Sequence, residues 1–334
     1  MEQELVALVR RWDAGEEPAI APQAALARLP FPPPSRAGLP ALTRYASLAR
    51  AGKLVPAGYV EASRGCLHTC LHCPVPAVYG GRFFTVPRDV VLTDIRRLVA
   101  AGAGHITFGD PDFLNGPGHA VKLVRALHDE FPHVSYDFTA KIEHLLEQRR
   151  LVPEFGATGC AFVVSAVESL SDRVLAQLEK GHTKADVLVA LDILRASGVP
   201  LRPSFIPFTP WSTRDDYLEL LSFIDTEGLI DHVDPVQYTI RLLIPPGSLL
   251  LSRPAIRPFL GALDPAAFTY RWTHPDPCMD ELQRAASALV ERAAREREDA
   301  WTTFNHLRAL AGGGVATPPP ERPIPARLTE PWFC

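Results

Sequence analysis

From residue 58 onward, short apolar runs alternate with longer segments of helical periodicity, and this rhythm limits the possible folds more than any other feature of the chain. Alternating strands and helices are typical of a parallel β-sheet covered by helices. Return helices are expected, for example, at Arg88–Ala101 and Pro117–Glu130. The pattern predicts six strand-then-helix units, with strands at Gly58–Ala62, His105–Phe108, Val134–Ala140, Cys160–Val167, Leu201–Phe208 and Val236–Leu243.

Right-handed units of this kind either curve into an open barrel or lie flat as a doubly wound sheet, and periodicity alone does not choose between them. In both α/β architectures, catalytic side chains are expected at the carboxyl ends of the strands. An amphipathic helix over residues 2–12 is expected to pack on the main body, and the helical segment 280–297 precedes a proline-rich tail. The predicted division is an N-terminal helical and proline-rich segment (1–57), a core (58–250) and a C-terminal helical extension (251–334).

Charge and hydropathy exclude several classes of protein. Lys and Arg number 34 against 38 Asp and Glu, so no global basic field exists to hold nucleic acid. The chain contains no apolar run near the roughly 18 residues that span a bilayer. With 47% hydrophobic residues the chain is expected to be globular, and we predict a cytoplasmic protein with neither nucleic acid nor membrane as its partner.

Three of the six cysteines, Cys66, Cys70 and Cys73, fall within eight positions directly after the first expected strand. With no secretory signal evident, such a group favours metal binding over disulfides. A [4Fe-4S] cluster needs four ligands, so this CxxxCxxC loop would leave one iron open to an external ligand. The alternative is a structural zinc site with His68 or His72 as the fourth ligand, although no second pair of ligands is evident.

Charged residues interrupt three of the later strands. Glu168 ends an otherwise apolar strand and therefore needs a polar partner, unless it only caps the following helix. Arg202 and Arg241 lie inside the fifth and sixth expected strands. Both are predicted to point toward a barrel interior or the carboxylate of a cofactor or substrate, with exposure at a sheet edge as the alternative.

The cysteine loop resembles the CxxxCxΦC signature of the radical SAM superfamily, whose aromatic position Φ is matched here by His72. Residues 108–113 occupy the place of the family's second-strand motif, which holds the amino group of S-adenosylmethionine (SAM). On this resemblance Gly109, Asp110 and Asp112 are expected to bind the cofactor. The alternative for the two aspartates is a helix N-cap and turn.

The resemblance continues into the fourth expected strand. Ser165 and Glu168 lie where the family contacts the ribose and the methionine carboxylate of SAM. Lys141, after the third strand, is expected to pair with a cofactor carboxylate, with an exposed surface lysine as the alternative. The resemblance implies a partial (β/α)6 barrel of the radical SAM type over residues 58–250, with helical and irregular extensions at both ends.

The family's reaction implies two cofactors and an electron donor. In radical SAM enzymes a reduced [4Fe-4S] cluster cleaves a carbon–sulfur bond of SAM to give a carbon radical, and a flavodoxin or ferredoxin is the expected donor. Most members form a 5′-deoxyadenosyl radical that abstracts hydrogen from a substrate. A minority release a 3-amino-3-carboxypropyl radical, and the motifs in this sequence do not separate the two outcomes.

The last six residues, 329–334, resemble the start of the tail of the CUAEP/CCAEP-tail radical SAM (seleno)proteins. We expect the native chain to continue past Cys334 with a selenocysteine, and Cys334 to take part in catalysis; a frayed end is the alternative. A related protein of arsinothricin biosynthesis suggests a metalloid substrate, so the sharpest hypothesis is 3-amino-3-carboxypropyl transfer to trivalent arsenic. The alternatives are hydrogen abstraction from a small molecule and a non-enzymatic zinc-binding scaffold.

Overall fold

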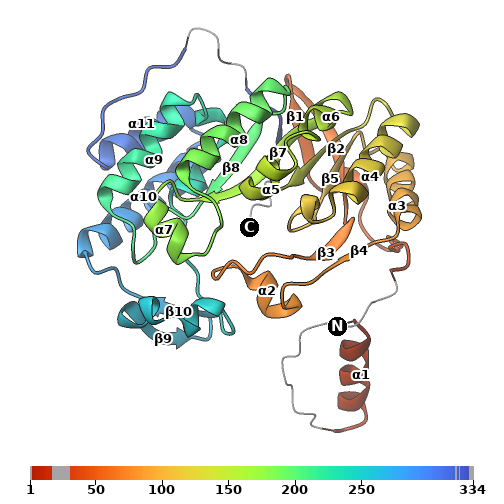
Figure 1. Cartoon of the computed structure of the whole chain (residues 1–334), viewed down its shortest axis with the longest axis horizontal. Coiled ribbons are helices and arrows are strands. Elements are labelled where there is room, and N and C mark those ends of the chain that lie inside the picture. The colour runs from red at the N-terminus through yellow and green to blue at the C-terminus, as the bar shows by residue number, and fades with distance from the viewer. Residues whose placement is uncertain (1, 17–30, 320–321, 323, 331–334) are drawn as a thin grey trace.

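The computed structural model describes residues 2–16, 31–319, 322 and 324–330, and its centre is a curved seven-stranded sheet (Figure 1). The strands lie in the order β11-β1-β2-β5-β6-β7-β8. Five neighbouring strands pair in parallel, which makes the α/β half-barrel that the alternating pattern predicted. They are β2 (Lys53–Val60), β5 (His105–Phe108), β6 (Ser135–Thr139), β7 (Cys160–Glu168) and β8 (Leu201–Phe205).

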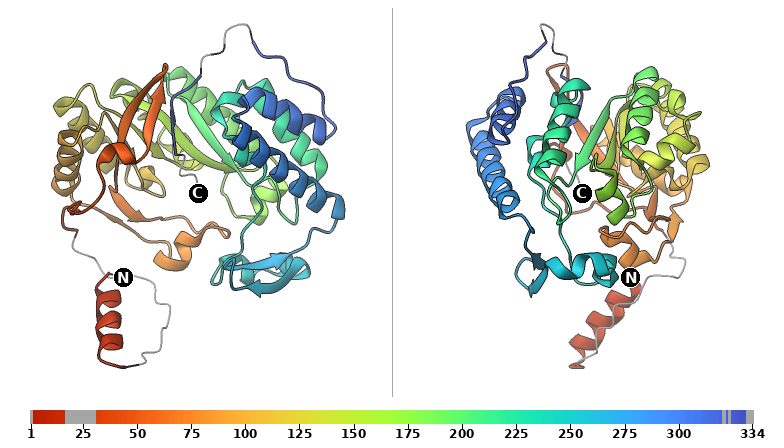
Figure 2. Two further views of the ribbon diagram at one scale, coloured as in Figure 1. Left: turned by 180° about the vertical axis from the view of Figure 1, so that it is seen from behind. Right: turned by 60° about the vertical axis from the view of Figure 1, so that its left-hand side comes forward.

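The helices that connect these strands cover one face of the sheet (Figures 1 and 2). Apolar residues at helical spacing, such as Val91, Ile95 and Leu98 on the first of them, lie buried in one large core against the strands. This core is the main hydrophobic stabilisation of the fold. The helices are α3 (Arg88–Ala100), α4 (Pro117–Glu130), α5 (Ile142–Glu147), α6 (Val152–Ala157), α7 (Asp172–Gln177), α8 (Lys184–Ala196) and α9 (Arg214–Thr226).

The sixth strand predicted at 236–243 does not form, and this part of the prediction is wrong. Residues Pro235–Tyr238 make a 3-10 helix (η4), and a single parallel bridge between Phe208 and Arg241 is what remains of the strand. Prolines at position 235 and at positions 245 and 246 bracket the segment, and each lacks the N–H that a sheet ladder requires. The barrel therefore stays open on the side of β8.

The other edge of the sheet carries two antiparallel strands that the sequence pattern did not reveal. β1 (Ser47–Arg50) forms a hairpin with β2, and β11 (Arg327–Leu328) pairs with β1 from nearly 280 residues away. Two hydrogen bonds, from Thr329 N to Ser47 O (2.8 Å) and from Ser47 N to Thr329 Oγ1 (3.0 Å), extend this pairing. Leu48, Phe162, Ala326, Leu328 and neighbouring residues form a separate apolar cluster on the face of the sheet that lacks the large core.

The C-terminal extension is a mixture of helices and a hairpin. Short 3-10 helices η5 (Leu249–Ser252) and η6 (Pro254–Phe259) lead to a hairpin of β9 (Leu260–Asp264) and β10 (Thr269–Trp272). Helices α10 (Pro277–Glu296) and α11 (Ala300–Leu310) follow and pack on each other, and α10 matches the helix expected at 280–297.

The N-terminal helix forms as predicted at Glu2–Asp13 (α1) but does not pack as expected. Figure 1 shows it standing away from the barrel, and Leu5, Val9 and Trp12 are each about half exposed. Among the described residues, no helix has the length and apolar character needed to cross a bilayer.

Candidate functional site

The cysteine loop begins at a turn beyond the carboxyl end of β2 that requires a positive φ. A short hairpin of β3 (Ser63–Gly65) and β4 (Phe83–Thr85) brackets it, and the loop ends where Cys73 starts helix α2 (Pro74–Tyr79). Gly65 has φ +82°, and a Cβ at this position would lie 2.3 Å from the Arg82 carbonyl oxygen. Only glycine adopts this backbone without strain, so the turn that presents the first cysteine depends on it.

The three thiols of the loop are free, with Cys70 buried and Cys66 and Cys73 half-buried. Burial raises the pKa of Cys66, and burial together with the neighbouring cysteines raises the pKa of Cys73 to about 11. Thiolates that are buried and repel one another need a compensating positive charge, which a metal centre supplies. The donor set therefore fits a cluster held by three soft ligands.

The two histidines of the loop use their rings elsewhere. The His72 Nε2 lies 3.0 Å from Glu168 Oε1, and the two nitrogens of His68 lie 3.1 Å from His144 Nε2 and Lys141 Nζ. His68 could join the thiols only by giving up one of these contacts, whereas the Nδ1 of His72 is buried without a hydrogen-bond partner among the described residues. The close spacing of the three cysteines, with no second pair of ligands in the sequence around them, favours a cluster over the zinc alternative.

Glu168 ends β7 in a left-handed conformation (φ +65°) and is almost fully buried. Its carboxylate contacts Lys180 Nζ at 3.2 Å in addition to His72. Although burial raises the pKa of Glu168, the Lys180 ammonium and then the His72 imidazole outweigh it and hold that pKa at about 2. Glu168 does not cap the following helix, and Lys180 also interacts electrostatically with Cys70 and Cys73, so this ion pair borders the cysteine loop.

The two aspartates after β5 are both engaged by the protein. Asp110 accepts hydrogen bonds from Ala62 N and from the Ser63 hydroxyl, and burial raises its pKa to about 7. Asp112 Oδ1 accepts from Leu114 N, so it caps a short 3-10 helix (η2, Phe113–Asn115), as the alternative reading of the sequence proposed. These aspartates shape the turn after β5.

Backbone packs closely at the same turn. A Cβ on Gly109 would lie 2.0 Å from the Tyr59 ring, and the Tyr59 hydroxyl donates to the Gly109 carbonyl oxygen (3.3 Å). The absence of a side chain at Gly109 thus serves packing against β2.

A group of five polar side chains connects the cysteine loop to the ends of β5 and β6. Lys141 is buried rather than exposed on the surface, and its Nζ lies 2.8 Å from Glu143 Oε2. Asp112 Oδ2 accepts a hydrogen bond from His144 Nδ1 at 2.7 Å, and His144 faces His68. The sequence interpretation missed Glu143 and His144 as site residues, although titratable residues in the first turn of a helix directly after a strand were a usable signal.

The remaining predicted site residues lie farther from the loop or face another way. Ser165 alternates along β7 with Val163 and Val167 and therefore points to the same face as they do. This puts its buried hydroxyl on the helix-facing side of β7. Arg202 does point to the face of the half-barrel opposite the large core, where it binds Asp234 Oδ2 (3.0 Å) and stacks over a phenylalanine ring. Edge exposure does not apply to Arg202, which is 2% exposed.

Arg241 serves the C-terminal extension. Its guanidinium lies 3.5 Å from the centre of the Trp272 ring and donates to Asp280 Oδ1 at 2.6 Å. These contacts hold β10 and α10 against the barrel, a structural use of the charge. Cys334, the predicted catalytic residue, lies outside the described residues.

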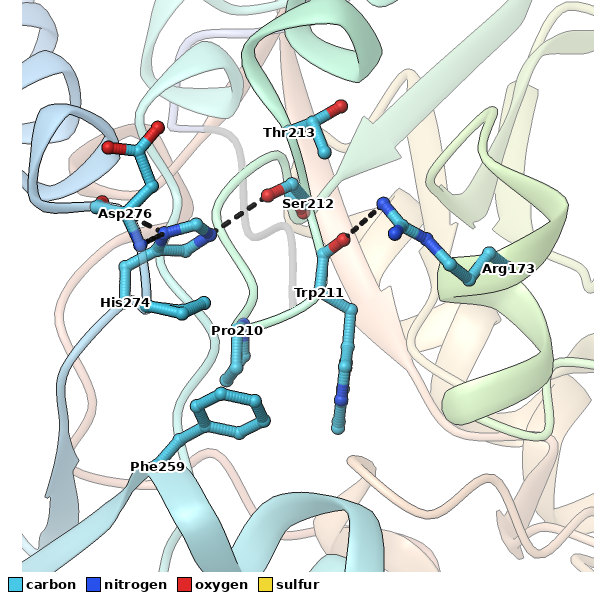
Figure 3. Close-up of a pocket in the computed structure, with 9 residues that line it drawn as sticks. Arg173, Pro210, Trp211, Ser212, Thr213, Phe259, His274 and Asp276 are labelled. Carbon is cyan, nitrogen blue, oxygen red and sulfur yellow. Dashed lines mark hydrogen bonds between the residues drawn. The ribbon is translucent and has the colours of Figure 1, made fainter.

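A cavity of about 460 Å³ opens beyond the carboxyl ends of β7 and β8 (Figure 3). The Trp211 and Phe259 side chains form apolar walls, and the Arg173 guanidinium donates to the Trp211 carbonyl oxygen (2.6 Å). His274 Nε2 donates to the Ser212 carbonyl oxygen at 2.8 Å, so its ring is fixed at the rim. The cavity is open to solvent, and its lining is mostly apolar.

Comparison with known proteins agrees with this geometry. The model of the radical SAM superfamily matches residues 60–224, which include the cysteine loop and the strands from β5 to β8. The chain also resembles cobalamin-dependent S-adenosylmethionine radical enzyme OxsB with a TM-score of 0.62 and 16% identity, over 76% of this chain and 46% of that chain. At this identity the likeness concerns the fold.

The curated relatives match from about half to about three quarters of this chain. A putative methylthiotransferase of Methanocaldococcus jannaschii is 26% identical over 52% of this chain and 40% of its own length. The ribosomal protein uS12 methylthiotransferase RimO of Porphyromonas gingivalis is 27% identical over 50% and 40%, and a tRNA-2-methylthio-N(6)-dimethylallyladenosine synthase of Corynebacterium efficiens is 26% identical over 77% and 48%. The chain spans less than half the length of each of these relatives.

Proposed function

Because this chain belongs to the radical SAM superfamily, we propose that it is an enzyme that cleaves SAM reductively and uses the resulting carbon radical on a small substrate. The cofactors of the superfamily, a [4Fe-4S] cluster and SAM, are its cofactors. The observation that carries the proposal is the loop of three free cysteines at the carboxyl end of a half-barrel, within the segment matched by the family model.

The protein's part is to hold the cofactors and to exclude water. Cys66, Cys70 and Cys73 supply the protein ligands of the cluster, and of the three Cys70 is buried while Cys66 and Cys73 are half-buried. Next to them, the Lys180 ammonium and the Glu168 carboxylate are paired with each other, and we propose that they bind the carboxylate and amino groups of the methionine part of SAM. When bound, the cluster supplies the electron that breaks a carbon–sulfur bond of SAM.

For the reaction itself we propose 3-amino-3-carboxypropyl transfer to trivalent arsenic. The carbon–sulfur bond to the carboxypropyl group breaks, methylthioadenosine leaves, and a carbon–arsenic bond forms. Overall, arsenic is oxidised from +3 to +5 while the sulfonium is reduced to a thioether, so the two changes balance. The one electron that would start the cleavage would be recovered when the arsenic product is oxidised, and no net reductant is consumed. Hydrogen abstraction by a 5′-deoxyadenosyl radical is the alternative that the same site would support.

The direction of β11 supports a role for Cys334 in this reaction. β11 is antiparallel to β1, which is antiparallel to β2, so β11 runs the same way as the parallel strands and toward their carboxyl ends. Thr329 is bonded to Ser47, level with Pro56 of β2. Five residues lead from Thr329 to Cys334, an extended reach of about 17 Å. We propose that the Cys334 thiolate, a soft ligand, binds the arsenic substrate.

The test is anaerobic reconstitution with iron and sulfide, reduction in the presence of SAM with and without arsenite, and mass spectrometry of the products. Arsenite-dependent methylthioadenosine with an arsenic-bearing amino acid supports the transfer, whereas 5′-deoxyadenosine alone supports hydrogen abstraction. Cys70→Ala removes a cluster ligand and is expected to abolish both products, while Cys278→Ala, an exposed cysteine on α10, leaves them unchanged. Retention of SAM cleavage by Cys70→Ala would contradict the assignment of the cluster.

A further inference from the structure

A second set of metal-ligating side chains lies beside the cysteine loop, and the proposed reaction does not use it. His68 from the loop and His144 from α5 face each other with their Nε2 atoms 3.1 Å apart, their ring centres 4.5 Å apart and their planes tilted by 57°. Together with Asp112 they place one ligand atom each within 4.8 Å of one another. Two nitrogens bound to one tetrahedral zinc ion at about 2.0 Å lie roughly 3.3 Å apart, close to the distance seen here.

The contacts of Asp112 make it an outer carboxylate rather than a direct ligand. Oδ1 accepts from Leu114 N at 3.0 Å, and Oδ2 accepts from His144 Nδ1 at 2.7 Å. With its proton on Nδ1, neutral His144 presents the lone pair of Nε2 toward His68. Metal-binding histidines characteristically donate the other ring nitrogen to a carboxylate in this way, which fixes both tautomer and orientation.

Glu143 is the candidate outer carboxylate of His68, as Asp112 is of His144. Its Oε2 lies 3.7 Å from His68 Nδ1, while the Lys141 ammonium lies between the two groups, 3.1 Å from His68 Nδ1 and 2.8 Å from Glu143 Oε2. Without a metal, Lys141 donates to His68 Nδ1, and the His68 Nε2–H donates to His144. With a metal on Nε2, the His68 proton sits on Nδ1 and Glu143 becomes its acceptor.

The charges of the group favour a cation. Asp112 and Glu143 contribute two negative charges and Lys141 one positive charge, so the net charge of the three is −1 before the imidazoles are counted. A divalent ion between the imidazoles is attracted by this net charge, while Lys141 opposes it at short range. The affinity is therefore set by the balance between Lys141 and Glu143.

We propose that His68 and His144 bind a divalent transition metal ion of the zinc class through their Nε2 atoms, with Asp112 and Glu143 as outer carboxylates. Imidazole nitrogen is a preferred donor for zinc and its neighbours in the series. Because the protein supplies two direct ligands, the other coordination positions are open to water or to an anionic oxygen of a substrate. This site is separate from the three cysteines and does not require that the arsenic reaction be correct.

The test is zinc binding to the cluster-loaded protein under anaerobic conditions, where iron occupies the cysteines. Iron and sulfide are measured first, to show that the cluster has formed. If no cluster forms, that result contradicts the proposed function but does not test the histidine site. The zinc titration is then carried out on the Cys66→Ala, Cys70→Ala, Cys73→Ala triple variant. We expect one zinc ion per chain by competition with a chromophoric chelator. Cobalt in its place should show ligand-field bands without a thiolate charge-transfer band.

Variants separate this site from incidental binding to surface histidines. His144→Gln and His68→Gln should each weaken zinc binding at least tenfold, and Asp112→Asn about 10- to 100-fold. His133→Gln, on an exposed histidine before β6, should leave the affinity unchanged. Circular dichroism checks that each variant is folded.

The ion pair of Lys141 and Glu143 provides a further test, because removing one charge or the other should change the zinc affinity in opposite directions. Lys141→Gln removes a positive charge and should tighten zinc binding, whereas Glu143→Gln should weaken it. Absence of zinc binding beyond the cluster, or binding that His144→Gln leaves intact, would show that the two rings form only a hydrogen-bonded pair.

Discussion

Replacing Lys180 by methionine should destabilise the protein through the carboxylate that it leaves behind. Lys180 and Glu168 are 4% and 6% exposed, so neither charge is solvated when the other is removed. The pKa of Glu168 falls from its ordinary 4.5 to about 2 in the folded protein, a difference worth about 3 kcal/mol. Removal of one partner of a buried ion pair costs about 3–5 kcal/mol. Since His72 also holds the pKa of Glu168 down and keeps its contact with the carboxylate, we expect a loss near the lower value.

The pH dependence has a definite sign. Because the folded pKa of Glu168 is depressed, its contribution to the free energy of unfolding is fully present above pH 4.5 and is lost as the pH falls through about 2. Urea unfolding of wild type and Lys180→Met should therefore differ by about 3 kcal/mol at pH 7 and by progressively less as acid protonates Glu168 in both proteins.

Lys184 provides the matched control. Its pair with Glu219 is exposed on both sides, and Lys184→Met should cost less than about 1 kcal/mol. Adding Glu168→Gln to Lys180→Met should recover part of the lost stability, because no buried charge is then left unpaired. If Lys180→Met costs no more than Lys184→Met, or if the double variant is strictly additive, the buried pair does not have the energetics argued here.

Three further predictions concern the loop, the C-terminal strand and the extension. Gly65→Ala should lower iron and sulfide content after reconstitution and cost at least about 1 kcal/mol, because the new methyl meets a carbonyl oxygen at positive φ, whereas Gly314→Ala, in open space, should change neither. Leu328→Ala should lower the free energy of unfolding by about 2 kcal/mol in urea, since this side chain is 7% exposed; an unchanged midpoint would mean that β11 adds little. Arg241→Met should change the SAM affinity measured by equilibrium dialysis by no more than about twofold, because the guanidinium already contacts the Trp272 ring. A tenfold loss of affinity would indicate that Arg241 binds the cofactor after all.

Five of the six predicted parallel strands are present, because apolar runs bounded by turn residues report strands directly. His105–Phe108 is confirmed at both ends, and Cys160–Val167 is extended by one residue. The failure at 236–243 shows the limit of the method, since hydropathy there resembles a strand while the flanking prolines deny it ladder hydrogen bonds. β11 was hidden for another reason: a two-residue strand has no periodicity, and its partner lies far away in the chain.

In the candidate site too, the sequence predicted the features that depend on neighbouring residues and missed those that depend on distant ones. The loop of Cys66, Cys70 and Cys73 was visible in the sequence because all its ligands lie within eight residues, so their spacing alone indicates a metal site. The partners of the charged residues were not visible. Glu168 pairs with Lys180, which a short helix brings back to the end of β7, and no pattern in the sequence linked these two residues.

What the sequence by itself determined is the part of this protein that depends on near neighbours: the alternation that makes a half-barrel and the spacing that makes a cysteine loop. What only the tertiary structure decided is which charges meet. His68 and His144 are 76 residues apart, and they face each other because a loop after β2 and a helix after β6 converge at one edge of the sheet. Periodicity is a property of consecutive residues, whereas electrostatic pairing depends on distances that strand order and curvature set.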